Sequence, residues 1–319
     1  SRMLADIGGT NARFAWQAGP GQALEHVAVL QCADYTGLAQ AVDAWLSQHR
    51  LARPEKAAMA VACAVQSDQI RLTNNDWSFS ILDLKSQLGL QELVVVNDFT
   101  ALALSLPSIS ADHLLQMGGQ SQAPFEHRLP VALLGAGTGL GVSGLLPDRH
   151  GGWLALSGEG GHVSLPIHDE VQYQVWTVLQ KRFGHVSAER VLSGQGLVNI
   201  YTSLPSLGSG QSSEQTITPA QVTDLALSQR DPLAVQALTL FARWLGSAAG
   251  DLALTLGATG GVFIGGGIAP RVADFLQGAD FRRSFEDKGR FAAFLRPLPI
   301  WIIDTPVSPA LQGVATLLD

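Results

Sequence analysis

The sequence has little charge and no long run of basic residues. Lysine, arginine, aspartate and glutamate make up 15% of the 319 residues, where about 25% is usual in soluble domains. Acidic residues outnumber basic ones by 27 to 20, and no basic run is longer than a pair such as Arg282 and Arg283. Nucleic acids and anionic membranes bind clustered lysine and arginine. We therefore expect no nucleic acid and no membrane partner, and look for small-molecule ligands.

Cysteine is also scarce. Cys32 and Cys63 are the two in the sequence, too few for a four-cysteine zinc site, and their number suits a reducing compartment without a disulfide. A strand-like run begins at Met3, so we expect no signal peptide and a cytoplasmic location. The apolar stretch 245–268 has one charged residue but is rich in glycine in its second half. This favours a buried helix and strand over a membrane span.

Three common motifs are absent as well. The chain contains no Gly-Lys pair and hence no P-loop. Residues 135–141 read G-x-G-x-G-x-G instead of G-x-G-x-x-G and join two strand-like runs, which disfavours a dinucleotide fold. No G-x-S-x-G occurs, so a hydrolase nucleophile elbow is excluded.

Glycine, in contrast, is abundant, with 34 residues, about 11% against a usual 7% or so. Two glycine turns stand at equivalent places in two sets of strand-like runs, 3–7, 13–17 and 25–31, then 131–134, 140–145 and 153–156. Helices and strands alternate after each set. This pattern predicts a duplicated α/β fold with ligands at the carboxyl ends of strands, in a cleft between two halves.

The remaining elements are predicted from periodicity and turn residues. We expect strands at 57–65, 93–96, 262–264 and 300–303, helices at 38–52, 82–88, 170–182, 189–201, 233–256, from 270 onward and at 309–318, and loops at 107–130 and 203–218.

Both glycine turns are suited to hold phosphate through backbone N–H groups. An ordinary hairpin turn is the alternative, but two such turns in equivalent places favour phosphate binding. Asp6, before the first turn, is suited to hold a magnesium ion through water. The candidate residues are Asp6, Gly8, Gly9, Thr10 and Asn11 in the first turn, and Gly135, Gly137, Thr138 and Gly139 in the second.

Longer motifs extend this pattern. The runs L-A-D-I-G-G-T-N-A-R at 4–13, L-G-A-G-T-G-L-G at 134–141 and G-V-F-I-G-G-G-I-A-P at 261–270 resemble the phosphate and adenosine motifs of the actin, Hsp70 and sugar-kinase superfamily. More narrowly, V-V-V-N-D-F-T-A-L-A at 94–103, S-G-E-G-G-H at 157–162 and E-R-V-L-S-G-Q-G-L-V-N-I-Y at 189–201 resemble the bacterial glucokinases of the non-ROK type. The resemblance covers nearly the whole chain.

The resemblance implies a fold, ligands and an assembly. The fold would be α/β, with two ribonuclease H-like (actin-like ATPase) domains and a cleft between them. A smaller domain would comprise 1–107 and 305–319, and a larger one 108–304. ATP and Mg²⁺ would bind together with glucose, Gly265, Gly266 and Gly267 would lie against the adenosine, and the protein would act in glycolysis as a homodimer. Close packing of strand and helix is the alternative interpretation of the three glycines.

The candidate base is Asp98, at the carboxyl end of a buried strand. The resemblance implies that it accepts the proton of the glucose 6-hydroxyl, giving glucose 6-phosphate and ADP. A helix N-cap is the alternative role, and both roles are compatible. The resemblance also implies that sugar hydroxyls are bound by Asn97, Glu159, His162, Glu189 and, with less support from its loop, Asn75. By residue type alone, His162 would be a polar core residue and Glu189 an acid in the first turn of a helix.

The residues after His162 lack the cysteine cluster that follows E-x-G-H in ROK kinases, so we expect no zinc. We expect no DNA-binding helix-turn-helix before Leu4, which disfavours a ROK repressor. Two alternatives stay open: a kinase for another hexose, and an actin- or Hsp70-like ATPase.

Overall fold

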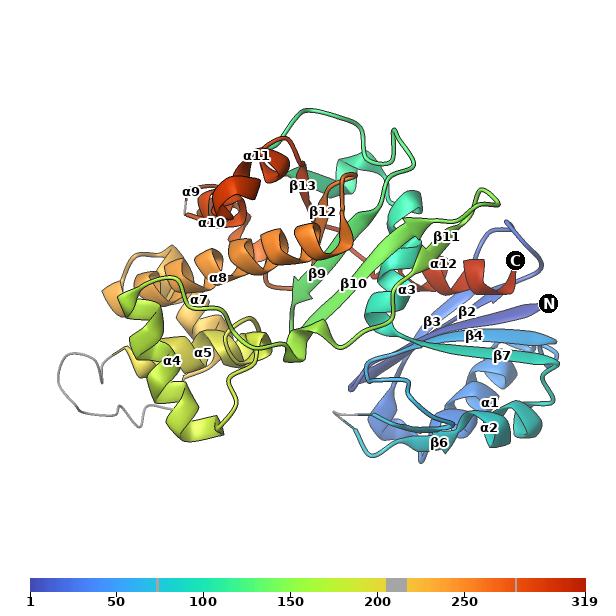
Figure 1. Cartoon of the computed structure of the whole chain (residues 1–319). Helices are drawn as coiled ribbons and strands as arrows, with labels where there is room; N and C mark the ends of the chain where they lie inside the picture. Colours follow the sequence, from blue (N-terminus) through green and yellow to red (C-terminus); the bar gives the residue numbers. More distant parts are fainter. Residues whose placement is uncertain (73–74, 205–216, 279) are drawn as a thin grey trace. The chain divides into compact units, whose positions relative to one another are not determined.

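The computed structural model describes residues 1–72, 75–204, 217–278 and 280–319, which form two compact units (Figure 1). The first unit comprises Ser1–Ile109, Trp153–Ser157 and Thr305–Asp319, and the second comprises Ser110–Gly152 and Gly158–Asp304. These units differ from the predicted domains in that residues 108–109 and 153–157 fall with the first.

The first unit is built on a five-stranded sheet in the order β3-β2-β1-β4-β7. Its strands are β1 (Arg2–Ile7), β2 (Asn11–Gln17), β3 (Glu25–Gln31), β4 (Lys56–Val61) and β7 (Glu92–Asn97). The strands β1, β4 and β7 are parallel. The last residue of each strand lies beside the last residue of its neighbour, because Val61 pairs with Ile7 on one side and with Asn97 on the other. Their carboxyl ends are therefore level at one edge, where Gly8 and Asp98 follow.

Helices cover both faces of this sheet because residues alternate between the faces along each strand. On β1, Met3 belongs to a core with Trp45 of α1 (Leu38–His49) and Leu84 of α2 (Ile81–Leu88). Leu4 faces the other way, into a core with Ala101 of α3 (Asp98–Ser105) and with α12 (Ala310–Ala315). A small hairpin of β5 (Gln69–Arg71) and β6 (Ser78–Ser80) completes the regular structure before α2.

The C-terminal helix α12 packs tightly on α3. A Cβ atom at Gly313 would lie 1.9 Å from the carbonyl oxygen of Ala101, so only glycine permits this approach. The buried Arg2 of β1 donates to the carbonyl of Leu318 at 2.6 Å and to the carboxylate of Asp319 at 2.7 Å. These contacts join the end of the chain to its beginning.

The second unit has a sheet in which β10-β9-β12-β13-β8 follow one another. These strands are β8 (Leu114–Gln116), β9 (Val131–Ala136), β10 (Leu140–Pro147), β12 (Val262–Gly265) and β13 (Ile300–Ile303). The parallel strands β9, β12 and β13 are buried along their whole length, as expected where helices cover a sheet. The short β11 (Trp153–Ala155) packs against α3 in the first unit.

The helices among the described residues of the second unit are α4 (Glu170–Phe183), α5 (Gly194–Ser203), α7 (Pro219–Leu227), α8 (Pro232–Leu256), α9 (Ala273–Gly278), α10 (Phe281–Glu286) and α11 (Ala292–Leu295). The long α8 crosses α10 closely, since a Cβ at Gly246 would lie 2.1 Å from the carbonyl oxygen of Phe281. Within the described ranges, no helix combines the length and the apolar character that a membrane crossing requires.

Several sequence expectations need correction. The helix expected at 189–201 begins at Gly194, because Ser193 is extended and its side chain caps the helix by accepting from the N–H of Gly196. The strand expected at 57–65 ends at Val61. Among its described residues, the region from Pro270 contains two 3-10 turns and three short helices instead of one helix. The expected loop at 107–130 includes β8, and most of the one at 203–218 lies outside the described residues.

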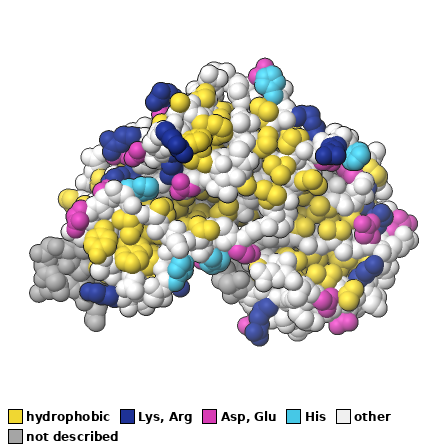
Figure 2. Space-filling view, viewed as in Figure 1, with side chains coloured by type: hydrophobic (Ala, Val, Ile, Leu, Met, Phe, Trp, Pro, Cys, Tyr) yellow, Lys and Arg dark blue, Asp and Glu magenta, His cyan; other side chains and the backbone are white. Residues whose placement is uncertain are grey.

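Surface charges are interspersed, and many pair locally. On the face drawn in Figure 2, lysine and arginine side chains lie singly or in small groups among acidic ones. Lys56 and Glu92 are 2.7 Å apart, as are Arg53 and Asp43. Such exposed pairs contribute little to stability.

Candidate active site

The predicted base, Asp98, is the first residue of α3 and comes directly after β7. The side chain of the preceding residue, Asn97, caps the helix: its Oδ1 accepts from the N–H of Phe99 at 2.9 Å. The Oδ1 of Asp98 accepts from the same N–H at 2.9 Å, and the amide of Asn97 donates to the carbonyl of Cys63 at 3.1 Å. The start of α3 thus orients both side chains at the edge of the sheet.

Burial gives Asp98 an unusual affinity for protons. The pKa of this carboxyl is raised from 3.8 to about 6, mainly by burial and in smaller part by the negative charge of Asp6, against the opposing effect of the N–H of Phe99. Burial also raises the pKa of Asp6, against the opposing effects of Arg13 and Ser308. Arg13 lies opposite Asp6 on β2, with 3.4 Å between Nη1 and Oδ2. No basic side chain pairs with Asp98 among the described residues.

The donor set suits magnesium in one respect. Mg²⁺ is commonly held by one or two carboxylates together with phosphate oxygens and water. Asp6 and Asp98 are two partly buried carboxylates whose charges repel each other, and a cation would relieve that repulsion. In the described part of the chain, no three or more histidine, cysteine or acidic side chains form a metal-binding group. A magnesium ion here would therefore depend on substrate phosphate for part of its ligands.

The first glycine turn, between β1 and β2, leaves backbone donors open. The N–H of Gly8 closes the turn by donating to the carbonyl of Asn11 at 2.9 Å, and the N–H of Cys32 donates to the carbonyl of Thr10 at 2.8 Å. The N–H groups of Gly9 and Thr10 have no partner within the described ranges, and Thr10 is exposed. Such unpaired N–H groups at a turn favour an anion.

Asn75, predicted as a sugar ligand, lies against this same turn. Its Nδ2 donates to the carbonyl of Gly8 at 3.4 Å, and its Oδ1 accepts from the N–H of Trp77 at 2.8 Å. Asn11 accepts from the side chain of Gln31 at 2.7 Å. The side chains of Asn75 and Asn11 therefore support the shape of the turn.

The second glycine turn, between β9 and β10, has the same character. The N–H of Gly137 donates to the carbonyl of Gly139 at 2.8 Å. The N–H groups of Thr138 and Gly139 have no partner in the part of the chain that is described. The next N–H, of Leu140, donates to Oε2 of Glu189 at 2.9 Å.

Two of the other candidate glycines, Gly135 and Gly266, are required by packing within the second unit. Gly135 pairs with Gly265 across β9 and β12, and a Cβ at Gly135 would lie 2.4 Å from the carbonyl of Gly265. Gly266 has a φ of +81°, and its Cβ would lie 2.3 Å from the carbonyl oxygen of Ala136. Gly267 is exposed with open space around its Cβ position. Gly267 is thus the member of the triplet free to face a ligand.

The three sugar candidates of the second unit lie on neighbouring turns. Glu159 and His162 are exposed at the 3-10 turn Gly160–His162, which is fixed on β10 because a Cβ at Gly161 would lie 2.2 Å from the carbonyl oxygen of Leu140. The chain then pairs with the segment before Glu189, where the N–H of Ala188 donates to the carbonyl of Val163 at 2.8 Å. This brings the turn carrying Glu189 into contact with the turn carrying His162.

The site residues are divided between the units. Asp6, the first turn, Asn75, Asn97 and Asp98 belong to the first unit, and the second turn, Glu159, His162, Glu189 and Gly265–Gly267 belong to the second. Sequence reasoning missed the contacts of Arg13 and Ser308 with Asp6. Arg13 lies within the first motif, whereas no sequence signal singles out Ser308, more than 300 residues away.

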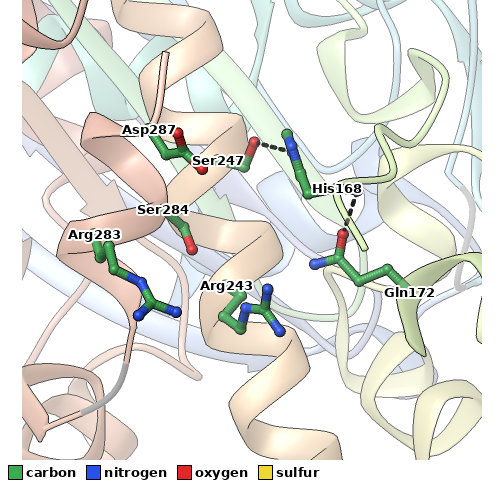
Figure 3. Close-up of a pocket in the computed structure, with 7 residues that line it drawn as sticks. All are labelled: His168, Gln172, Arg243, Ser247, Arg283, Ser284 and Asp287. Atoms are coloured by element: carbon green, nitrogen blue, oxygen red, sulfur yellow. Dashed lines mark hydrogen bonds between the residues drawn. The ribbon is translucent and has the colours of Figure 1, made fainter. Parts of the chain in front are cut away.

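A pocket in the second unit involves none of the predicted residues (Figure 3). It has a volume of about 40 Å³ and lies between α8, α10 and the residues around the start of α4. Its arginines are already paired: Arg243 with Asp169, and Arg283 with Asp280 at 2.7 Å. We assign it no ligand.

Comparison with known proteins places the whole chain in one family. The family described as Glucokinase matches residues 3–319. The glucokinase of Aromatoleum aromaticum is 48% identical over 319 residues, which cover 100% of this chain and 94% of that protein. The chain belongs to the glucokinase family. The glucokinase of Neisseria meningitidis serogroup B is similar at 44% identity, over 100% of this chain and 94% of its own.

Solved structures agree on the fold. The crystal structure of a glucokinase from an Antarctic psychrotroph superimposes with a TM-score of 0.86 at 33% identity and covers 99% of this chain and 98% of that one. The Thermus thermophilus ROK hexokinase shares the fold, with a TM-score of 0.66 at 17% identity, over 99% and 97% of the two chains. The predicted α/β sugar-kinase fold is confirmed. The chain is an enzyme, a sugar kinase that phosphorylates glucose.

Proposed function

We propose that this chain transfers the γ-phosphoryl group of ATP to the 6-hydroxyl of D-glucose, giving glucose 6-phosphate and ADP. The observation that carries the proposal is Asp98, a partly buried carboxylate with a pKa of about 6 and no paired cation in the described ranges. A base of this strength is ionised at neutral pH, yet accepts a proton more readily than an ordinary aspartate.

Two distant structures with bound ligands support the choice of substrates. A glucokinase from Balamuthia mandrillaris was crystallised with glucose, and a ROK family glucokinase from Streptomyces griseus was crystallised with glucose and AMPPNP. Both are 20% identical to this chain and share its fold, with TM-scores of 0.78 and 0.60. ATP and glucose are therefore our proposed substrates.

In the proposed reaction, Asp98 takes the proton of the 6-hydroxyl as that oxygen bonds to the γ-phosphorus. The bond from the γ-phosphorus to the bridging oxygen of ADP breaks, and Asp98 later returns the proton to solvent. The open N–H groups of the two glycine turns hold phosphate oxygens. Mg²⁺, held by Asp6 and by phosphate oxygens, would neutralise charge on the transferring group. Gly267 and its neighbours Gly265 and Gly266 would lie beside the adenosine.

Glucose specificity would come from carboxylates and amides that accept and donate to its hydroxyls. We assign this role to Glu159, His162, Glu189, Asn97 and Asn75. Closure of the site around glucose would exclude water, the competing acceptor. We further infer that the enzyme forms a homodimer, as its family resemblance implies, and that it acts in the cytoplasm.

The test is an ADP-release assay with glucose, mannose, fructose and no sugar. We expect the highest kcat/KM with glucose and little ATP hydrolysis without sugar. Asp98→Asn should lower kcat by about 10²- to 10⁴-fold while the KM for glucose changes little. Asp83→Asn is the matched control, because Asp83 also lies in the first turn of an eight-residue helix of the first unit but is exposed.

Three outcomes would overturn parts of the proposal. Preference for another hexose would reject glucose as the substrate, and rapid ATP hydrolysis without sugar would favour an actin- or Hsp70-like ATPase. Wild-type kcat in the Asp98→Asn variant would reject Asp98 as the base.

A further inference from the structure

The segment 189–196, E-R-V-L-S-G-Q-G, holds the second glycine turn at both of its ends. On one side, Oε2 of Glu189 accepts from the N–H of Leu140 at 2.9 Å. On the other side, the N–H of Gly194 donates to the carbonyl of Gly137 at 2.8 Å. Between these two points lie Thr138 and Gly139, whose N–H groups have no partner among the described residues. The segment therefore sets the position of the N–H groups that we assign to phosphate.

The two points of attachment are joined by a rigid piece of chain. Ser193 accepts from the N–H of Gly196 at 2.9 Å and donates to the carbonyl of Glu189 at 2.8 Å. A Cβ at Gly196 would lie 2.4 Å from the carbonyl carbon of Val191, so the chain folds back on itself closely. Ser193 is 3% exposed and Val191 is fully buried. Displacement of Glu189 at one end would therefore disturb the contact at the other.

The carboxylate of Glu189 also occupies the space beside the turn. A Cβ at Gly139 would lie 2.5 Å from Oε2 of Glu189, and the backbone of Gly139 lies outside the left-handed region. Glycine at this position thus makes room for the carboxylate, and an added methyl group would push that carboxylate away. Oε1 makes no hydrogen bond to any described residue, which leaves it open for a sugar hydroxyl.

We propose that Glu189 is a positioning residue for the second phosphate turn as well as a sugar ligand, so that glucose binding and nucleotide binding are coupled through its carboxylate. The proposal rests on the function proposed above. One carboxylate oxygen holds the turn and the other meets the sugar, so each ligand favours the geometry that the other requires. By linkage, glucose should strengthen nucleotide binding by the same factor by which the nucleotide strengthens glucose binding.

The test measures the Kd of AMPPNP calorimetrically on the full chain, without sugar and with saturating glucose. Without sugar, Glu189→Ala should weaken AMPPNP binding about tenfold, as expected for loss of a charged hydrogen-bond acceptor. Glu189→Gln keeps a carbonyl oxygen for the N–H of Leu140 and should restore most of the affinity. Glu159→Ala is the matched control, since Glu159 is a proposed sugar ligand and makes no hydrogen bond to the turn. It should leave AMPPNP affinity without sugar unchanged.

A second variant tests the route of the effect and does not depend on the folding of Glu189→Ala alone. Gly139→Ala should weaken AMPPNP binding by displacing the carboxylate, and Gly139→Ala combined with Glu189→Ala should be no weaker than Glu189→Ala. Glucose should tighten AMPPNP binding in the wild type and in Glu189→Gln, but not in Glu189→Ala.

Unchanged AMPPNP affinity in Glu189→Ala, equal losses in Glu189→Ala and Glu159→Ala, or additive losses in the double variant would overturn the proposal. AMPPNP binding requires no turnover, so a wild type that binds AMPPNP but fails to phosphorylate glucose would refute the proposed function separately. A wild type that does not bind AMPPNP would refute both.

Discussion

Replacing Asp98 by asparagine should stabilise the protein at neutral pH while it removes most of the activity. The buried carboxyl has a pKa of about 6 in the folded chain, against an ordinary value of 3.8, mainly because burial disfavours its charge. The folded state therefore binds the proton more tightly than the unfolded state does. Between these two pKa values the free energy of unfolding falls as pH rises, and above pH 6 the loss is complete.

The size of this loss follows from the pKa difference. A rise from 3.8 to about 6 corresponds to about 3 kcal/mol. The asparagine side chain of the variant would carry no charge, and its carbonyl oxygen would still accept from the N–H of Phe99 at the start of α3. Asp98→Asn should therefore raise the free energy of unfolding by up to about 3 kcal/mol at about pH 7.5, and hardly at all at about pH 4.

Urea unfolding followed by circular dichroism at these two pH values measures the effect, with Asp83→Asn as the exposed control. The reasoning predicts a higher urea midpoint for Asp98→Asn at the higher pH and midpoints close to wild type for Asp83→Asn at both. A midpoint for Asp98→Asn at the higher pH equal to or below that of the wild type would show that the charge of Asp98 is not costly in the folded protein.

Of three further predictions, two concern Asp98 and Asp6 in the first unit, and one concerns the core of the second unit. The kcat/KM for glucose should fall about tenfold for each pH unit below 6, because protonated Asp98 is no longer a base; a rate that stays level down to about pH 4.5 would contradict the raised pKa. Asp6→Asn removes the neighbouring charge, so it should lower the pKa of Asp98 and move this acidic limb to lower pH, whatever its effect on kcat; an unmoved limb would assign the raised pKa to burial alone. Gly246→Ala should cost about 1–3 kcal/mol by forcing α8 from α10, whereas Gly19→Ala, with nothing within 4 Å of its Cβ position, should cost far less; equal urea midpoints would show that the crossing adjusts freely.

Much of the fold follows from local sequence pattern. The strand at 25–31 has the predicted bounds, and the helix at 170–182 extends by one residue, to Phe183, because the Asp169 cap and the Gly184 stop are local signals. The helix predicted at 189–201 exists, but its predicted start is wrong: the side chain of Ser193 caps the helix, which therefore begins at Gly194 and not at Glu189. The three-residue β8 is recognisable only through its pairing with β13, nearly 190 residues later.

The candidate site also has features that local sequence indicates and features that depend on tertiary packing. The motifs indicate which residues to consider, and the resemblance assigns their roles, which remain predictions. The pKa of Asp98 depends on burial and on Asp6, more than 90 residues earlier, so no local pattern contains it. Similarly, the hydrogen bond that Glu189 accepts from the N–H of Leu140 depends on how two segments that are distant in the sequence pack together. Residue type and spacing indicate that a carboxylate is present, but its tertiary contacts determine its pKa and its hydrogen-bond partners.

The return of residues 305–319 to the first unit has a consequence for synthesis. A chain made from its N-terminus has all of β1 to β7 and α3 available early, yet α12 leaves the ribosome only after the second unit has been made. Until then, the face of the sheet that carries Leu4, and the side of α3 that receives Gly313, have no cover from α12. The part of the enzyme that holds Asp98 is therefore completed only after residues 305–319 have been made. A chain released before residue 305 would contain every proposed site residue. It would still lack α12, which packs against α3, the helix whose first residue is the proposed base Asp98.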